Sequence, residues 1–194
     1  MTYDFAFFVN AVLFGIGLAM DAFSVSMANG LNEPSMKKSR MCLIAGTFCF
    51  YQIAMPLIGW LCVHTIANTF MAFQKFIPYI ALILLLYIGG KMLIEGIRGG
   101  TDECAPAVSF SALMVQGIAT SIDALSVGFT IAELPFPAAL TESLIIGAVT
   151  FVICIGGLLI GKKFGTKLSG KASILGGAIL VFIGLEIFIK GVFF

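Results

Sequence analysis

Long apolar runs constrain this chain more than any other feature of its sequence. A helix needs about 20 mostly apolar residues to cross the hydrocarbon core of a bilayer. Backbone polar groups find no water there, so crossing segments of this kind are helices rather than open strands. The sequence therefore predicts an all-α integral membrane protein with six transmembrane helices. The six segments are Phe5–Ala28, Met41–Val63, Phe76–Ile97, Val108–Ala132, Ser143–Gly161 and Ala172–Phe193.

The scarcity of charge supports this prediction and excludes several classes of protein. Only 11% of the 194 residues are charged, against roughly 25% in soluble domains. No basic run is interleaved with aromatic residues, so we expect no nucleic-acid partner, and nothing indicates an obligate protein partner. The five cysteines are scattered, and the single histidine, His64, lies beside Trp60 at a helix end. The sequence therefore predicts neither a disulfide framework nor a zinc site.

Basic residues in the short loops predict the orientation of the chain. The first loop holds Lys37, Lys38 and Arg40, and the fifth holds four lysines, whereas the second and fourth together hold only Lys75. Short loops rich in lysine and arginine stay in the cytoplasm. We therefore expect the odd-numbered loops in the cytoplasm and both termini outside it.

The two halves of the chain resemble each other. Gly15–Val25 matches Gly117–Val127 in register at Gly, Ile, Asp, Ala, Ser and Val, so that Asp21 aligns with Asp123, 102 residues later (123 − 21). Each half holds three predicted spans, an odd number, so the second half enters the membrane from the opposite side. Inverted repeats of this kind are a common transporter design, with the site near the midplane. We expect two inverted three-helix repeats in one transmembrane domain, residues 1–100 and 101–194.

Two carboxylates, Asp21 and Asp123, lie inside predicted spans. A charge in hydrocarbon is costly, and ionisable residues in spans commonly serve function. The two aspartates come together if the first and fourth helices line the repeat axis. Two close carboxylates stay ionised only with a cation between them. They therefore predict a cation site, a proton relay, or both. The structural alternative is that each aspartate caps or bonds a neighbouring helix.

Neutral oxygens accompany these aspartates. Ser24 and Ser126 each follow an aspartate by three residues, on the same helical face, and Thr120 precedes Asp123 by three. Gln52, four residues before a proline, is a polar side chain in the middle of the second span. It either faces the site or makes an interhelical hydrogen bond. Oxygen ligands suit Mg²⁺, Ca²⁺ or Mn²⁺ better than copper or zinc.

Charged residues near the ends of the third and sixth spans are weaker candidates. Glu95 follows Lys91 by four residues and is a further candidate ligand, with an ion pair whose side chains snorkel to the interface as the alternative. Glu186 and Lys190 repeat this spacing with the signs exchanged, and there the ion pair is the favoured interpretation.

Five motifs carry a resemblance over nearly the whole chain: Met20–Ser26, Gln52–Trp60, Gly89–Gly96, Ala119–Gly128 and Ile174–Gly177. With them the sequence resembles the MntP family of bacterial manganese exporters, within the wider group of lysine-exporter-like transporters. The resemblance implies six helices in the plasma (inner) membrane and export of Mn²⁺ as a substrate, with no cofactor. It also implies that Asp21 and Asp123 are the first ion-handling residues. Ser26 has Gly128 as its counterpart, so the two halves of the site differ chemically.

The function that these features favour is secondary active export of Mn²⁺ by proton antiport. Moving a charge of +2 outward against an inside-negative potential costs about 4.6 kcal/mol per 100 mV. The sequence has no GxxxxGK[ST] motif for a nucleotide, and the aspartates would take up protons as the metal leaves. The alternatives are an exporter of an organic cation or amino acid, and a passive divalent-cation channel. An intramembrane enzyme lacks a nucleophile with a base, so the prediction is a transporter, not an enzyme.

Overall fold

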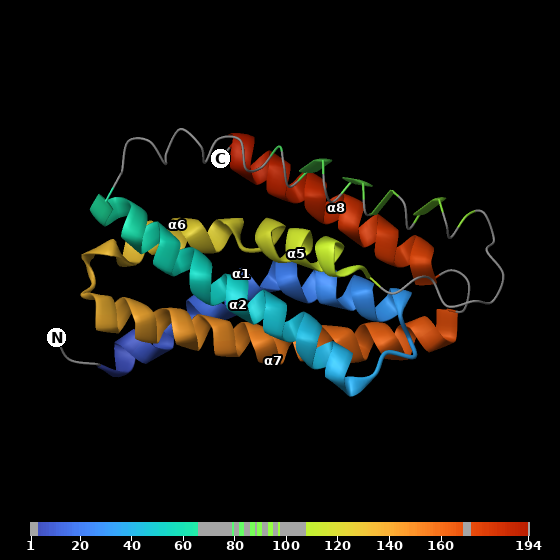
Figure 1. The fold of residues 1–194 in the computed structure, drawn as a ribbon, viewed down its shortest axis with the longest axis horizontal. Coiled ribbons are helices and arrows are strands. Elements are labelled where there is room, and N and C mark those ends of the chain that lie inside the picture. The colour runs from blue at the N-terminus through green and yellow to red at the C-terminus, as the bar shows by residue number, and fades with distance from the viewer. Residues whose placement is uncertain are drawn as a thin grey trace.

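Helices make up every regular element in the part of the chain that the structure describes (Figure 1). This computed structural model describes residues 4–65, 108–168 and 172–193, together with separate positions between Tyr79 and Ile97. Four helical segments are long and apolar enough to cross a membrane. They are Phe5–Asn32, Lys38–His64, Phe110–Glu133 and Phe136–Gly165. The prediction of an all-α membrane protein is therefore confirmed.

The helix bounds agree with the predicted spans over most of the described residues. The sixth predicted span coincides with a helix, whereas the fifth begins at Phe136 rather than at Ser143. The third predicted span, Phe76–Ile97, lies largely outside the described residues, so the total of six spans stays a prediction. The elements are α1 (Phe5–Asn32), α2 (Lys38–Thr65), α5 (Phe110–Ala119), α6 (Ile122–Thr130), the 3-10 turn η1 (Ile131–Glu133), α7 (Phe136–Leu168) and α8 (Ala172–Phe193).

The bundle has an apolar core that also holds several polar side chains, and its outside is largely apolar. Asn29, Gln52 and Gln116 are fully buried, whereas Phe50 and Val152 are 64% and 69% exposed. Large apolar side chains on the outside of a bundle are suited to lipid, which offers no hydrogen bonds. The buried amides must therefore form hydrogen bonds within the bundle. Their bonding partners show where the helices cross.

Three glycines of α7 bring its backbone against that of α1. A Cβ at Gly157 would lie 2.7 Å from the carbonyl oxygen of Phe23, so only glycine fits there. The contacts advance four residues at a time along both helices, which therefore run parallel (Figure 1). This spacing is typical of close helix packing in membranes. The pairs are Gly157 with Phe23, Gly161 with Met27, and Gly165 with Leu31.

A second close contact joins α2 to α6. A Cβ at Gly128 would lie 2.7 Å from the Cα of Gly59 and 2.9 Å from the backbone nitrogen of Trp60. Earlier along both helical segments, Gly117 of α5 packs against Tyr51 of α2. The helix α2 thus runs parallel to α5 and α6, and each of α6 and α7 is joined by glycine to a helix from the other half of the chain.

Helices α2 and α7 run in opposite directions. A Cβ at Gly147 would lie 2.7 Å from the Cδ1 of Ile53. Further along α2, the ring of Trp60 lies 5.6 Å from the ring of Phe136, where α7 begins. The Trp60 indole also donates to the carbonyl oxygen of Leu134 at 2.9 Å. The end of α2 and the start of α7 therefore meet at one end of the bundle.

The fourth predicted span is interrupted near its middle. α5 ends at Ala119 and α6 begins at Ile122. The hydroxyl of Thr120 donates to the carbonyl oxygen of Gln116 at 2.9 Å, and the hydroxyl of Ser121 donates to that of Gly117. Adjacent hydroxyl side chains that bond back to the preceding turn compete with the backbone ladder. The sequence prediction of a helical span holds, but the helix in it is discontinuous.

The glycine contacts predict which small substitutions the bundle tolerates. Gly161→Ala places a methyl group against the α1 backbone, and overpacking of this kind costs about 1–3 kcal/mol. Gly156→Ala, on the same helix, meets open space and removes the entropic cost of a helical glycine. Thermal unfolding of the purified protein in detergent should show a lower Tm for Gly161→Ala alone. Equal Tm values for the two variants would contradict the α1–α7 contact.

Candidate functional site

Gln52 lies where helices from both halves of the chain cross. It is fully buried on α2. Its Nε2 donates to the carbonyl oxygen of Leu18 on α1 at 3.0 Å and to that of Thr120, between α5 and α6, at 3.4 Å. Leu18 and Thr120 are separated by the same 102 residues (120 − 18) that separate the two aspartates. One side-chain amide thus joins equivalent backbone positions of the two sequence repeats.

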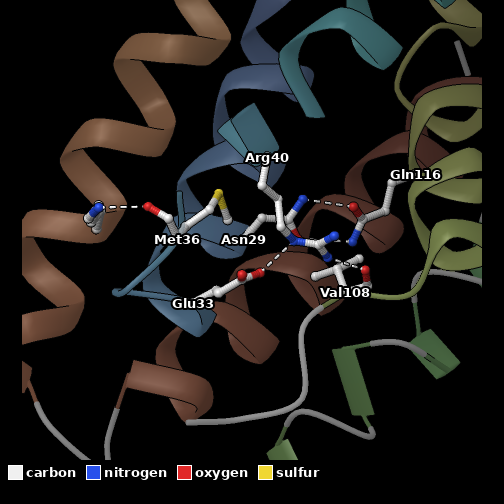
Figure 2. A network of polar contacts seen from close by, with 7 residues as sticks. Asn29, Glu33, Met36, Arg40, Val108 and Gln116 are labelled. Atoms are coloured by element: carbon white, nitrogen blue, oxygen red, sulfur yellow. Dashed lines mark hydrogen bonds and ion pairs between the residues drawn. The ribbon is translucent and has the colours of Figure 1, made fainter. Parts of the chain in front are cut away.

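Helices α1 and α5 run in opposite directions. From the Gln52 crossing, α1 leads forward to Asn29 and α5 leads backward to Gln116. These two buried amides form a pair, with Asn29 Nδ2 donating to Gln116 Oε1 at 2.9 Å and Gln116 Nε2 donating to Asn29 Oδ1 at 3.3 Å. Figure 2 shows the pair. Because this pair shows that α1 and α5 are antiparallel, it determines on which side of Gln52 each aspartate lies.

The two aspartates lie on opposite sides of the Gln52 crossing along the bundle. Asp21 follows Leu18 by three residues and Asp123 follows Thr120 by three, on antiparallel segments. A helix rises 1.5 Å per residue, so each backbone position lies roughly 4.5 Å beyond the crossing. Asp21 is partly exposed and Asp123 is exposed, in the first turn of α6. The Asp123 carboxylate also accepts from the Ala124 amide at 2.8 Å.

The predicted hydroxyl ligands are placed differently from one another. Thr120 is buried, Ser24 is partly exposed and Ser126 is exposed. The Ser24 hydroxyl donates to the carbonyl oxygen of Met20 at 3.1 Å, as the Thr120 hydroxyl does to its own helix. A hydroxyl that donates its hydrogen keeps lone pairs on the oxygen. These bonds therefore orient the oxygens without removing their capacity to bind a cation.

Two buried polar atoms have no hydrogen-bond partner in the described part of the chain. They are Gln52 Oε1 and Ser26 Oγ. The amide nitrogen of Gln52 is held by two carbonyl oxygens, so its Oε1 points away from both. A buried acceptor without a partner costs about 1–3 kcal/mol. Of the two alternatives for Gln52, the interhelical hydrogen bond is present, and the oxygen atom is left available.

Two further pairs of charged residues were considered from the sequence. Glu95 and Lys91 lie outside the described residues, as do the side chains of Glu186 and Lys190. Within the described residues, no three His, Cys, Asp or Glu side chains gather into a metal cluster. Among the described residues, the candidate ligands are therefore two aspartates and neutral oxygens.

Several buried polar residues were missed by the sequence analysis. The predicted spans leave Asn29 in a loop and Gln116 within an apolar helix. Glu142 was placed just outside the fifth span, but it lies inside α7 and is 4% exposed. Asn29 follows Asp21 by eight residues, two helical turns along the same face. That spacing was the signal for Asn29; an isolated Gln or Glu in an apolar span offers no such pattern.

At one end of the bundle, charged side chains connect neighbouring helices and loops (Figure 2). Arg40 of α2 pairs with Glu33 at 2.9 Å and donates to the carbonyl oxygen of Val108 at 2.5 Å. Lys162 of α7 donates to the carbonyl oxygen of Met36 at 2.8 Å. The loop after α1 is thereby joined to α2, to the start of α5 and to α7. This is the end that carries the basic loops.

A family model matches most of the chain. The model described as "Putative manganese efflux pump" (Mntp) matches residues 35–188. The chain belongs to this family. It is a family of transporters rather than enzymes, which confirms the resemblance in the sequence.

Curated relatives agree over nearly the full length. A "Putative manganese efflux pump MntP" of Ruminiclostridium cellulolyticum is 40% identical over 185 residues, covering 94% of this chain and 96% of the relative. Relatives of the same name in Methanobrevibacter smithii and Clostridium botulinum (strain Loch Maree / Type A3) are 39% and 41% identical, covering 92% and 94% of this chain and 95% and 94% of their own. No solved structure matches the chain.

Replacing Gln52 tests the crossing. Gln52→Leu removes both hydrogen bonds to the backbone while keeping a similar volume. We expect the loss of about 1–3 kcal/mol of stability, at about 1 kcal/mol per hydrogen bond. Circular dichroism melts in detergent would measure it. Asn10→Leu, on the exposed face of α1, is the control that should melt as the wild type does. A Gln52→Leu protein as stable as this control would exclude the crossing.

Proposed function

We propose that this chain exports Mn²⁺ by exposing a site between Asp21 and Asp123 to the two sides of the membrane in turn. The discontinuous helix at Thr120 and Ser121 carries the proposal, because transporter sites are commonly built where a spanning helix is broken. Asp123 lies in the first turn of the helix after the break. The relatives named for manganese efflux supply the identity of the ion, and the ion is then a substrate rather than a cofactor.

The helix contacts support an inverted repeat of residues 1–100 and 101–194. Under the 102-residue offset, α6 corresponds to α1, and Gly161 of α7 corresponds to Gly59 of α2 (161 − 59 = 102). Gly59 meets α6, and Gly161 meets α1. Each contact is thus the counterpart of the other. Equivalent helices, α1 with α5 and α2 with α7, run antiparallel, as a two-fold axis in the membrane plane requires.

The donor atoms suit a hard or borderline divalent cation. Mn²⁺ favours oxygen ligands in an octahedral arrangement. Helical side chains lean toward the N-terminus of their helix, so Asp21 and Asp123 both lean toward the Gln52 crossing. The oxygens that complete the proposed site are those of Ser24, Thr120, Ser126 and Gln52, with Glu95 as a further candidate from the sequence.

Proton antiport is the proposed source of energy. Carrying a charge of +2 outward costs about 4.6 kcal/mol per 100 mV of inside-negative potential. An exposed carboxylate in a span is far cheaper beside water than beside lipid, which favours an aqueous route to Asp123. Asp21 and Asp123 would lose Mn²⁺ and take up protons in the same step, so inward proton movement would drive metal release. Mn²⁺, other divalent cations and protons are thus the proposed small partners.

The basic end of the bundle is the proposed cytoplasmic end, which places both termini outside the cytoplasm in the plasma (inner) membrane. Arg40 and Lys162 lie there, as the positive-inside rule requires. Their contacts with Glu33, Met36 and Val108 close this end. Loading of Mn²⁺ from the cytoplasm then requires these contacts to break.

Asp21→Asn and Asp123→Asn test the site. Each substitution removes a charge and a proton acceptor with little change of shape. We expect Mn²⁺-dependent proton movement in proteoliposomes to fall to the level of empty liposomes in both. Asp4→Asn, at the exposed start of α1, should transport normally. Coupled transport retained by both site variants would falsify the proposal. Mn²⁺ flux without proton movement in the wild type would indicate a channel, and lysine flux an organic-cation exporter.

Arg40→Gln tests the closed end. It removes the pair with Glu33 and the bond to Val108, so the open-inward state becomes easier to reach. Because part-exposed ion pairs contribute about 1 kcal/mol or less, we expect the concentration of cytoplasmic-side Mn²⁺ at half-maximal transport to fall by roughly fivefold at most. Lys38→Gln, an exposed basic residue of the same helix, is the matched control. An increase in that concentration, or the same change in both variants, would contradict a gating role.

A further inference from the structure

Glu142 is a largely buried residue whose carboxyl the proposed metal site does not use. It lies within the spanning segment Phe136–Gly165 and is 4% exposed. Among the described residues, no hydrogen bond or ion pair reaches its side chain. A carboxylate without donors or a cation is costly in such surroundings, whereas the neutral acid is much less so.

Glu142 lies one helical turn from the residues around the candidate site. Ile146, four residues later on the same face of α7, packs with Leu18 of α1 and Ala124 of α6. Ala124 is the residue after Asp123. A buried face of α7 therefore leads from Glu142 toward Asp123.

Glu142 also lies at the end of the bundle opposite the basic loops. Twenty residues of α7 separate it from Lys162 (162 − 142), which corresponds to about 30 Å of helix, the thickness of the hydrocarbon core. α7 begins only a few residues earlier, where Trp60 bonds to Leu134. On the proposed orientation, Glu142 is close to the external surface.

The surroundings of Glu142 suit a proton better than a metal ion. Its neighbours on the same face of α7 are Ala138, Ala139 and Ile146, all buried and apolar. A lone carboxyl would leave Mn²⁺ with an unbalanced charge and too few oxygen ligands. A proton needs neither, because protonation makes the group neutral.

Few of the described titratable groups lie at this end of α7. The titratable groups of the neighbouring elements at this end are exposed, except for the partly buried Cys62 thiol. Within the described residues, none of them is bonded to Glu142. Toward the centre are the two site aspartates, and the charged side chains of α8 lie outside the described set. Among the described residues, the groups at this end are Asp4, which caps α1, His64 and Cys62 of α2, and Glu133 of η1.

We propose that Glu142 is the external proton-uptake residue of the exchange. A proton from external water binds the Glu142 carboxylate, and a new O–H bond forms. When Mn²⁺ leaves, that proton moves to the Asp123 carboxylate, and Glu142 becomes ionised and ready for the next proton. This inference rests on the proposed antiport and assigns it a residue outside the metal site.

Glu142→Gln separates metal exchange from proton coupling. In proteoliposomes, radiolabelled Mn²⁺ exchanging against unlabelled Mn²⁺ should proceed at the wild-type rate, because the metal site is intact. Accumulation of Mn²⁺ driven by a pH gradient should fall at least tenfold. Glu133→Gln removes an exposed carboxyl near the same end and should preserve both activities, and Glu142→Asp should restore part of the coupling. Wild-type accumulation by Glu142→Gln would overturn the inference.

Infrared difference spectroscopy tests the proton on Glu142 independently of transport. Mn²⁺ binding to the wild-type protein should change a protonated-carboxyl C=O band, and Glu142→Gln should lack that band. A wild-type protein without the band would overturn the role of Glu142, even if antiport were present. A protein with the band but without any Mn²⁺-driven proton movement would instead overturn the antiport on which the inference rests.

Discussion

Close contact between helix backbones holds this bundle together. Lipid is as apolar as the side chains that face it, so helices in a membrane associate through tight packing and interhelical hydrogen bonds. Gly59 and Gly128 meet in one contact, and Gly161 meets α1 in the other. These approaches bring α1, α2, α6 and α7 close enough for Gln52 to reach two backbones at once. The candidate site therefore depends on residues that have no side chain.

The buried polar groups follow from the same closeness. Asn29 and Gln116 form hydrogen bonds with each other between two helices, and the amide nitrogen of Gln52 donates to backbone carbonyl oxygens. In the part of the chain that the structure describes, two buried side-chain atoms are left unpaired, Gln52 Oε1 and Ser26 Oγ. A bundle that pairs most of its interior polar groups and leaves oxygens unpaired near two aspartates is suited to a cation that supplies the missing partner.

Much of this could be predicted from the sequence because apolar length and composition leave few choices in a bilayer. The four described spans and the place of Gln52 inside one of them follow from local pattern. The break at Thr120 could not be predicted, since hydroxyl residues also occur in unbroken helices. Glu142 was missed for a related reason: α7 starts seven residues before the predicted span (143 − 136), and no sequence pattern marks a carboxyl that has no partner.

The single tryptophan gives the molecule an optical reporter of its own. Trp60 lies at the end of the bundle where α2, η1 and α7 meet; its indole bonds to the Leu134 carbonyl, and its ring stacks on His64 at 4.2 Å. Indole emission responds to hydrogen bonding and to the groups that contact the ring. Any rearrangement of this end alters both partners together. The intrinsic fluorescence of the unlabelled protein therefore reports on any rearrangement at the end of the bundle where α2, η1 and α7 meet.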